Sequence, residues 1–146
     1  MNLKPPEHGS VIRYAYLWAG ELGRGREDAR KDRPAVVLAL SVRSSDGQTE
    51  VLVLGATHTP PANPSDAVAL PPAVKRRLKL DDDASWIDTT EANAFIWPGP
   101  DIRPIAARKP STVIYGNIPA DLLQIVASSF LANRKRQQAQ IVARSR

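Results

Sequence analysis

The stretch PAVVLALSVRSSDGQTEVLVLGAT, residues 34–57, decides the expected fold. Two runs rich in valine and leucine, 34–42 and 51–57, flank the polar segment RSSDGQTE. The Asp46-Gly47 dipeptide in this segment is typical of a tight turn between two antiparallel strands, because glycine readily adopts the positive φ that such turns require. The pattern therefore predicts a central β-hairpin.

Further short strands are expected on both sides of this hairpin. Residues 9–18 are rich in β-branched and aromatic side chains, and SWIDT, NAFIWPG and STVIYG are further short apolar runs. The proline-rich segment 58–83 is expected to be irregular, with one short helix around PPAVKRRL. Residues 119–131 instead carry an apolar stripe of helical period. We expect a mainly β domain, a small and strongly bent sheet or barrel, with a C-terminal helix that covers its open side.

The positive charge of the chain is concentrated at its C-terminus. The net charge is +5, and residues 132–146 contain five basic and no acidic residues, so residues 1–131 are neutral in sum. We therefore expect residues 1–131 to form the barrel domain with its closing helix, and residues 132–146 to form a basic arm, helical or disordered. Local clusters or this arm would have to attract nucleic acid.

The composition excludes several classes of protein. The chain has no cysteine, which excludes disulfides and thiolate metal sites, and two histidines cannot by themselves form a multi-histidine zinc site. No Walker, Rossmann, HExxH or GxSxG motif is present. No apolar run is long enough to span a membrane, and the start MNLKPPEHGS lacks the apolar core of a signal peptide. These features favour a soluble cytoplasmic protein that uses no metal and no cofactor.

The two ends of the hairpin carry the candidate chemistry. Arg33 precedes the first strand, and the segment THT, residues 57–59, ends the second. Antiparallel pairing should bring these ends together, with position 34 opposite about position 59 unless the register shifts. Arginine matches the geometry of a phosphate with two parallel hydrogen bonds, and a threonine hydroxyl can donate another. Such a pair is suited to holding a phosphodiester and stabilising additional negative charge on it.

Each of these residues also has an ordinary structural explanation. Arg33 can be a solvated residue beside a strand, and Thr57 can reflect the strand propensity of threonine. His58 can be a surface residue, although histidine is able to act as an acid or a base near neutral pH. Packing in the core or at a sheet edge is the common role of tryptophans such as Trp18, Trp86 and Trp97.

The order of these parts resembles the MazF/PemK (Kid) family of toxin endoribonucleases from type II toxin-antitoxin systems. That family combines a Gly-x-(Val/Ile) strand, a charged loop, an Arg-Pro with a valine-rich strand, and a hairpin partner strand that ends in threonine. The corresponding parts here are Gly9-Ser10-Val11, the loop 19–32, Arg33-Pro34 and Thr57. The similarity covers residues 8–60, and TTEANAFIW, residues 89–97, resembles a later strand of the family.

The resemblance implies an SH3-like small barrel, usually a homodimer, that cleaves single-stranded RNA such as mRNA without a metal and is neutralised by a cognate antitoxin protein. Arg33 matches the family's catalytic arginine and Thr57 its catalytic threonine. Three features depart from the family pattern: Thr90-Glu91 replaces an Asp-Gln pair, the segment 58–85 is longer, and the basic arm is additional. The implied reaction is attack by the ribose 2′-hydroxyl, which gives a 2′,3′-cyclic phosphate.

We therefore expect four catalytic residues: Arg33, Thr57, Glu91 and His58. We expect RNA contacts from basic residues of the loop and from polar and aromatic residues of the sheet: Arg24, Arg26, Arg30, Lys31, Thr59, Asn93 and Trp97. The alternatives are a gyrase-poison-type protein, which shares the fold but acts by binding a protein, and a non-catalytic SH3-like binding module. A third alternative is a protein whose basic arm binds nucleic acid without cutting it.

Overall fold

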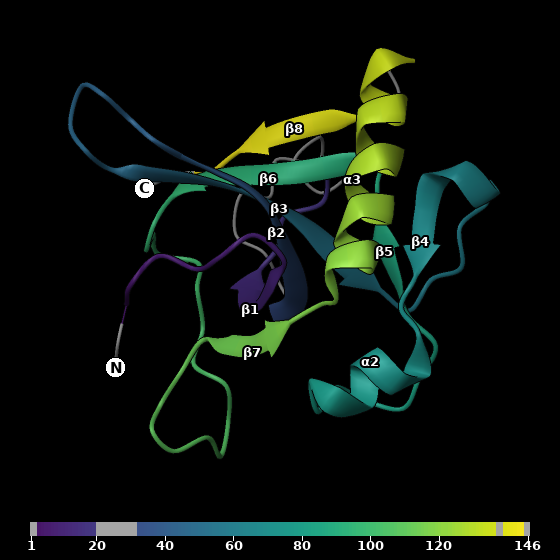
Figure 1. The fold of residues 1–146 in the computed structure, drawn as a ribbon, viewed down its shortest axis with the longest axis horizontal. Coiled ribbons are helices and arrows are strands. Elements are labelled where there is room, and N and C mark those ends of the chain that lie inside the picture. Colours follow the sequence, from purple (N-terminus) through teal and green to yellow (C-terminus); the bar gives the residue numbers. More distant parts are fainter. Residues whose placement is uncertain (1–2, 20–31, 137–138, 145–146) are drawn as a thin grey trace.

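The computed structural model describes residues 3–19, 32–136 and 139–144, and within them it has eight strands in one sheet and a C-terminal helix (Figure 1). The strands are β1 (Ser10–Ala15), β2 (Asp32–Val42), β3 (Thr49–Thr57), β4 (Ala67–Ala69), β5 (Trp86–Asp88), β6 (Glu91–Ile96), β7 (Ile114–Asn117) and β8 (Gln140–Ala143). The helices are the 3-10 turn η1 (Pro64–Asp66), α2 (Pro72–Arg77) and α3 (Ala120–Lys135). The architecture is therefore mainly β with a C-terminal helix, as the sequence predicts.

The central hairpin forms as predicted, from β2 and β3. Its turn is stabilised by the Asp46 carboxylate, which accepts a hydrogen bond of 3.0 Å from the amide of Gln48, while Gly47 takes a φ of +70°. The register shifts by one residue between Val37 and Ala39, which marks a β-bulge. The bulge, together with a turn centred one residue earlier than expected, changes which residues face each other at the open end of the hairpin.

Alternate residues of the hairpin face two different cores. Val36 and Leu54 pack against α3 through Val126 and Phe130. Val37 and Val53 on the opposite face pack in a second cluster that contains the aromatic residues Tyr14, Tyr16, Phe95 and Trp97. Because strand side chains alternate between faces, this two-sided burial explains why the sequence of the hairpin reads as a nearly continuous apolar run.

The remaining strands extend the hairpin on both sides. The order in the sheet is β4-β5-β3-β2-β1-β7, and β6 pairs with β3 and with β8. The strands predicted from SWIDT, NAFIWPG and STVIYG correspond to β5, β6 and β7, and the helix predicted around PPAVKRRL corresponds to α2. The three-residue strand β4 was not predicted, because its sequence, AVA, is too short to show a period.

The C-terminal segment differs from the expected basic arm. Helix α3 continues to Lys135, and residues 140–143 form β8, which runs parallel to β6. Ala139 and Val142 are buried, and Arg144 lies 3.1 Å from the Asp101 carboxylate in an ion pair with only 4% of its side chain exposed. The expectation that residues 132–146 form a solvated arm is therefore wrong for 139–144, which complete the sheet.

The described residues contain no helix with the length and apolar character needed to cross a bilayer. The predicted charged loop, 19–32, falls largely on residues 20–31, which lie outside the described residues. The expected RNA contacts of Arg24, Arg26, Arg30 and Lys31 lie there too and remain predictions.

Candidate functional site

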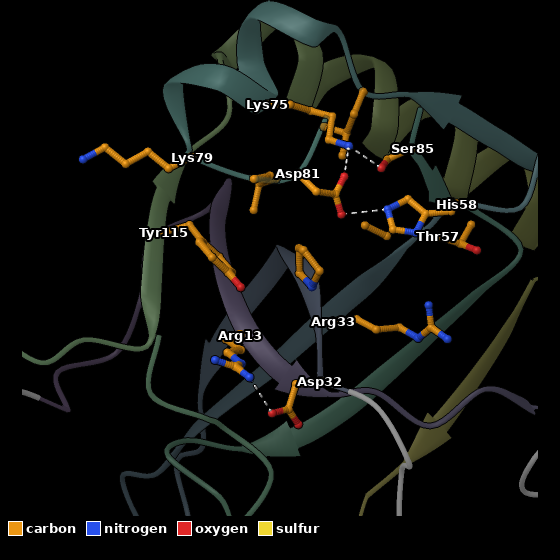
Figure 2. Close-up of a pocket in the computed structure, with 14 residues that line it drawn as sticks. Arg13, Asp32, Arg33, Thr57, His58, Lys75, Lys79, Asp81, Ser85 and Tyr115 are labelled. Carbon is orange, nitrogen blue, oxygen red and sulfur yellow. Dashed lines mark hydrogen bonds and ion pairs between the residues drawn. The ribbon is translucent and has the colours of Figure 1, made fainter. Parts of the chain in front are cut away.

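A pocket of about 370 Å³ lies at the open end of the hairpin, where β2 begins and β3 ends, and Figure 2 shows the side chains around it. Its walls come from β1, β2, β3 and β7, from α2, and from the segments on either side of α2. The lining includes four cations, Arg13, Arg33, Lys75 and Lys79, against two carboxylates, Asp32 and Asp81. Both carboxylates are already paired, Asp32 with Arg13 at 3.3 Å and Asp81 with Lys75 at 2.7 Å. The pocket is therefore suited to an anionic ligand.

Arg33 and Thr57 lie at neighbouring strand ends at the mouth of this pocket. The antiparallel pairing of Ala35 with Gly55, continued by two residues along each strand, places Arg33 opposite Thr57. Both residues line the pocket. The sequence thus predicted correctly that an arginine and a threonine meet at this rim, although the expected pairing of position 34 with about position 59 was wrong, because of the bulge and the earlier turn centre.

The donor groups of these two residues are open to a ligand. Within the described part of the chain, the Arg33 side chain has no hydrogen bond and no ion pair, and its guanidinium lies 5.3 Å from the centre of the Trp18 ring. A cation over an indole ring keeps its N–H groups available at the edge. The Thr57 hydroxyl accepts a hydrogen bond of 3.1 Å from the amide of Thr59, which leaves its own O–H free to donate.

Beyond Thr57, a chain of polar contacts leads from the pocket into the protein. The Nε2 atom of His58 lies 2.9 Å from Asp81 Oδ2, and Lys75 Nζ donates to Asp81 Oδ1 at 2.7 Å (Figure 2). Lys75 also donates to Ser85 Oγ at 2.6 Å and to the carbonyl of Asp83. His58 is half exposed whereas Lys75 is only 5% exposed, so the chain joins a solvent-facing imidazole to a buried ammonium group.

The contacts of Asp81 with Lys75 and His58 favour its ionised form. The hydrogen bond from Lys75 holds the pKa of the Asp81 carboxyl below its ordinary value, and His58 adds to the same effect. Oxygen and nitrogen atoms of His58, Asp81 and Asp83 also lie within 4.8 Å of one another, which is a spacing that a metal ion could use. However, the Lys75 ammonium group already donates a hydrogen bond to Asp81, and its positive charge would repel a metal cation bound to the same carboxylate.

The pairing of Asp81 with Lys75 predicts a pH-dependent contribution to stability. Because the pKa of Asp81 is lowered on folding, its contribution is present above the ordinary carboxyl pKa of about 3.9 and is lost as the pH falls through the lower folded value. The urea midpoint of the wild type should therefore exceed that of Asp81→Asn at pH 5, and the difference should shrink below about pH 3. A difference that stays constant down to pH 2 would contradict the pairing.

A second hollow, of about 430 Å³, shares its rim with the pocket. Arg33 and Thr57 line both, and the second hollow is also lined by Trp18, Thr59 and Thr90. Thr59, which the sequence predicts to contact RNA, thus lies beside Arg33 and Thr57. An extended ligand that crosses the rim would have space on both sides of it.

Three of the predicted site residues are not at this rim. Glu91 lines neither hollow, and its Oε1 accepts a hydrogen bond of 2.9 Å from the amide of Ala19. Asn93 is fully buried and clamps both the amide and the carbonyl of Leu17, at 2.9 and 2.8 Å. Trp97 is 7% exposed and donates from its indole to the carbonyl of Leu3. Asn93 and Trp97 therefore have structural roles in place of the expected RNA contacts. Glu91 lies outside both hollows, and its catalytic role remains a prediction.

The sequence did not predict that Lys75, Asp81 and Ser85 belong to this site. They lie in KRRLKLDDDAS, which reads as an ordinary solvated run of charges, and nothing in its spacing points to the hairpin end. One feature of the sequence could have indicated that Lys75 is buried. Lys75 lies between Val74 and Leu78, and these two apolar side chains form the buried side of α2 and its C-terminal end. A lysine that follows the apolar face of a short helix can enter the interior if carboxylates are near.

Comparison of the chain with models of known protein families, and with the sequences of curated proteins, gave no match.

Proposed function

We propose that the protein is a metal-independent endoribonuclease of the MazF/PemK type, a toxin whose partners are single-stranded mRNA and a cognate antitoxin. The observation that carries this proposal is the pairing of Arg33, which has no anionic partner in the described residues, with Thr57 at the mouth of a cationic pocket. The resemblance of residues 8–60 to that family supports it, and so does the mainly β fold with a C-terminal helix. In this proposal the sheet is an SH3-like barrel that acts as a homodimer.

The proposed reaction is an internal transesterification. The 2′-oxygen of the ribose on the 5′ side of the scissile phosphate attacks phosphorus, and the bond from phosphorus to the 5′-oxygen breaks. His58 takes the proton of the 2′-hydroxyl, and the departing 5′-oxygen takes a proton from water. The products are a 2′,3′-cyclic phosphate and a free 5′-hydroxyl. The nucleophile is tethered beside the phosphate, so its approach costs little entropy.

Arg33 and Thr57 supply the charge stabilisation that this reaction needs. As phosphorus becomes five-coordinate, its non-bridging oxygens gain negative charge, and donors fixed in advance lower the barrier most. Arg33 offers two parallel N–H groups to these oxygens, while the Thr57 O–H offers a third donor from the opposite strand. The two hollows that share the rim would take the nucleotides on either side of the scissile phosphate.

The non-catalytic binding module remains the alternative to test. It assigns no chemistry to Arg33 and Thr57, which both line the pocket. Incubation of the purified protein with RNA of mixed sequence, followed by mapping of the cut ends, separates the two. Discrete cuts that end in cyclic phosphate support the nuclease, and intact RNA at high protein concentration contradicts it.

Cleavage should persist in EDTA, because Arg33 and Thr57 provide the charge stabilisation and the nucleophile belongs to the substrate. An oligonucleotide with one deoxyribose on the 5′ side of the scissile bond should survive, since it lacks the attacking hydroxyl. The same oligonucleotide with its deoxyribose elsewhere is the matched control and should be cut. Loss of activity on chelation, with recovery on adding magnesium, would contradict this mechanism and would direct attention to His58, Asp81 and Asp83.

A further inference from the structure

Lys75 is a charged group buried in the wall of the pocket, and every hydrogen of its ammonium group is used. It is 5% exposed, and its Nζ donates to Asp81 Oδ1, to Ser85 Oγ and to the carbonyl of Asp83. Burying an ammonium group is costly unless it is paired and fully hydrogen-bonded. Because an ammonium group has three donors, this set of partners fixes its position completely.

The consequence for Asp81 is that its carboxylate is held in one orientation. Lys75 binds one oxygen, Oδ1, so that the other, Oδ2, lies against His58 Nε2 at 2.9 Å (Figure 2). An ionised carboxylate only accepts hydrogen bonds. The His58 Nε2 atom must then carry the proton of the bond, and in the neutral imidazole Nδ1 is left with its lone pair.

We propose that Lys75 is a positioning residue, which acts through Asp81 to hold neutral His58 in the tautomer with the proton on Nε2, so that Nδ1 can accept the proton of the ribose 2′-hydroxyl. The part of this inference that concerns catalysis rests on the proposed function, whereas the tautomer does not. The other titratable or charged groups around His58 are Asp83, whose ligand atom lies within 4.8 Å of those of His58 and Asp81, and five further residues of the pocket: Arg13, Asp32, Arg33, Lys79 and Tyr115.

The tautomer can be measured without RNA. Long-range proton–nitrogen NMR spectra distinguish Nδ1 from Nε2 protonation, and the chain has only two histidines, of which the exposed His8 serves as an internal reference. Above pH 8 the wild type should show His58 as the Nε2–H tautomer. Lys75→Met should convert it to a mixture, because Asp81 is then free to turn away. The wild type showing the Nδ1–H tautomer would overturn the proposal.

The kinetic test uses a matched pair of lysine variants. Lys75→Met should lower kcat for RNA cleavage roughly 10- to 100-fold and should leave KM nearly unchanged. The loss should not exceed the roughly 10²- to 10⁴-fold that a general base contributes in total. The acidic limb of the kcat profile should move to higher pH, because loss of a nearby positive charge favours the protonated imidazole. Lys135→Met removes the same charge from an exposed position on α3, outside both hollows, and should keep the wild-type limb and the tautomer.

The outcomes separate the positioning role from a structural one. A Lys75→Met protein that is less stable but keeps the Nε2–H tautomer and the wild-type limb would overturn the proposal. If Lys75→Met does not fold, Asp81→Ala replaces it, since Asp81 is half exposed and Lys75 keeps its other two partners. Asp81→Ala should lose the tautomer preference, and retention of that preference would overturn the proposal. A wild-type protein that cuts no RNA would refute the proposed function, while the NMR spectra would still decide the role of Lys75.

Discussion

Arg33→Ala and Thr57→Ala should each lower the rate of RNA cleavage by about 10²- to 10³-fold, the usual effect of removing one preorganised donor from a site of developing charge. Both side chains lie at the mouth of the pocket and line it from opposite strands. The double variant should lose little more than the more damaging single variant, because the two donors act on the same phosphate as a unit. Single-turnover cleavage of an end-labelled oligonucleotide measures these rates.

These substitutions should leave folding nearly intact. Arg33 forms no ion pair with another described residue, and its contact with Trp18 is worth about 0.5–1 kcal/mol at a partly exposed site. Arg77→Ala, which removes a charge from the exposed side of α2, is the control for net charge and should cleave at nearly the wild-type rate. An Arg33→Ala protein that keeps full activity would remove the foundation of the proposed function, as would a Thr57→Ala protein with full activity.

Replacement of Arg33 by lysine tests the geometry rather than the charge. An ammonium group cannot form two parallel hydrogen bonds to one phosphate, so Arg33→Lys should recover only a small part of the lost rate. Its affinity for RNA should stay close to that of the wild type, because the net charge is unchanged. Full recovery of the rate by lysine would mean that Arg33 acts only by attracting the substrate.

The central hairpin and the meeting of Arg33 with Thr57 could be predicted because local signals specify them. The Asp46-Gly47 turn and the two apolar runs define an antiparallel pair, and residues at the open ends of such a pair must meet. Only the register was missed, because the turn is centred one residue earlier than Asp46-Gly47 and because a β-bulge leaves no clear mark in a run of valine, leucine and alanine. These two effects shift the pairing without changing which ends come together.

The positions that were predicted wrongly depend on distant packing. Asn93 and Trp97 look available in a strand sequence, yet the first binds the backbone of Leu17 and the second that of Leu3. The sequence near residues 93–97 does not predict the contacts with Leu17 and Leu3, because both partners lie more than 70 positions away in the chain. A buried amide or indole always needs a polar partner, so polar residues inside an apolar strand are as easily explained by such clamps as by a ligand.

Lys75 and Asp81 in the wall of the pocket were not predicted from the sequence, because their position also depends on distant packing. The segment that carries Lys75 and Asp81 is rich in charge, and the sequence alone gave it no role beyond a short helix. Its place beside His58 follows from β4 and β5, which bring the intervening chain back onto the end of β3. Long-range strand pairing of this kind depends on the whole sheet, which a local reading of the sequence does not contain.

The basic C-terminus looked solvated for a related reason: five positive charges and no negative ones suggest a surface arm. Arg144 instead donates to the carbonyl of Ala15 at 2.8 Å and to Asn93 Oδ1 at 3.2 Å, in addition to its ion pair with Asp101. Arg144 thus links β1, the middle of β6 and the loop that follows β6. The prediction drawn from this is about stability rather than RNA affinity.

Arg144→Met should destabilise the protein by about 3–5 kcal/mol, because it removes one partner of a buried ion pair and leaves the carboxylate of Asp101 to be compensated elsewhere. Deletion of residues 137–146 should cost more, since it also removes Val142 from the interior and exposes the edge of β6. Urea denaturation followed by circular dichroism gives both values.

The control is Lys135→Met, which removes the same charge from an exposed position and should change stability by less than about 0.5 kcal/mol. If instead the deletion leaves the urea midpoint unchanged and lowers RNA affinity with a shallower salt dependence, the C-terminus acts as the basic arm that the sequence first suggested.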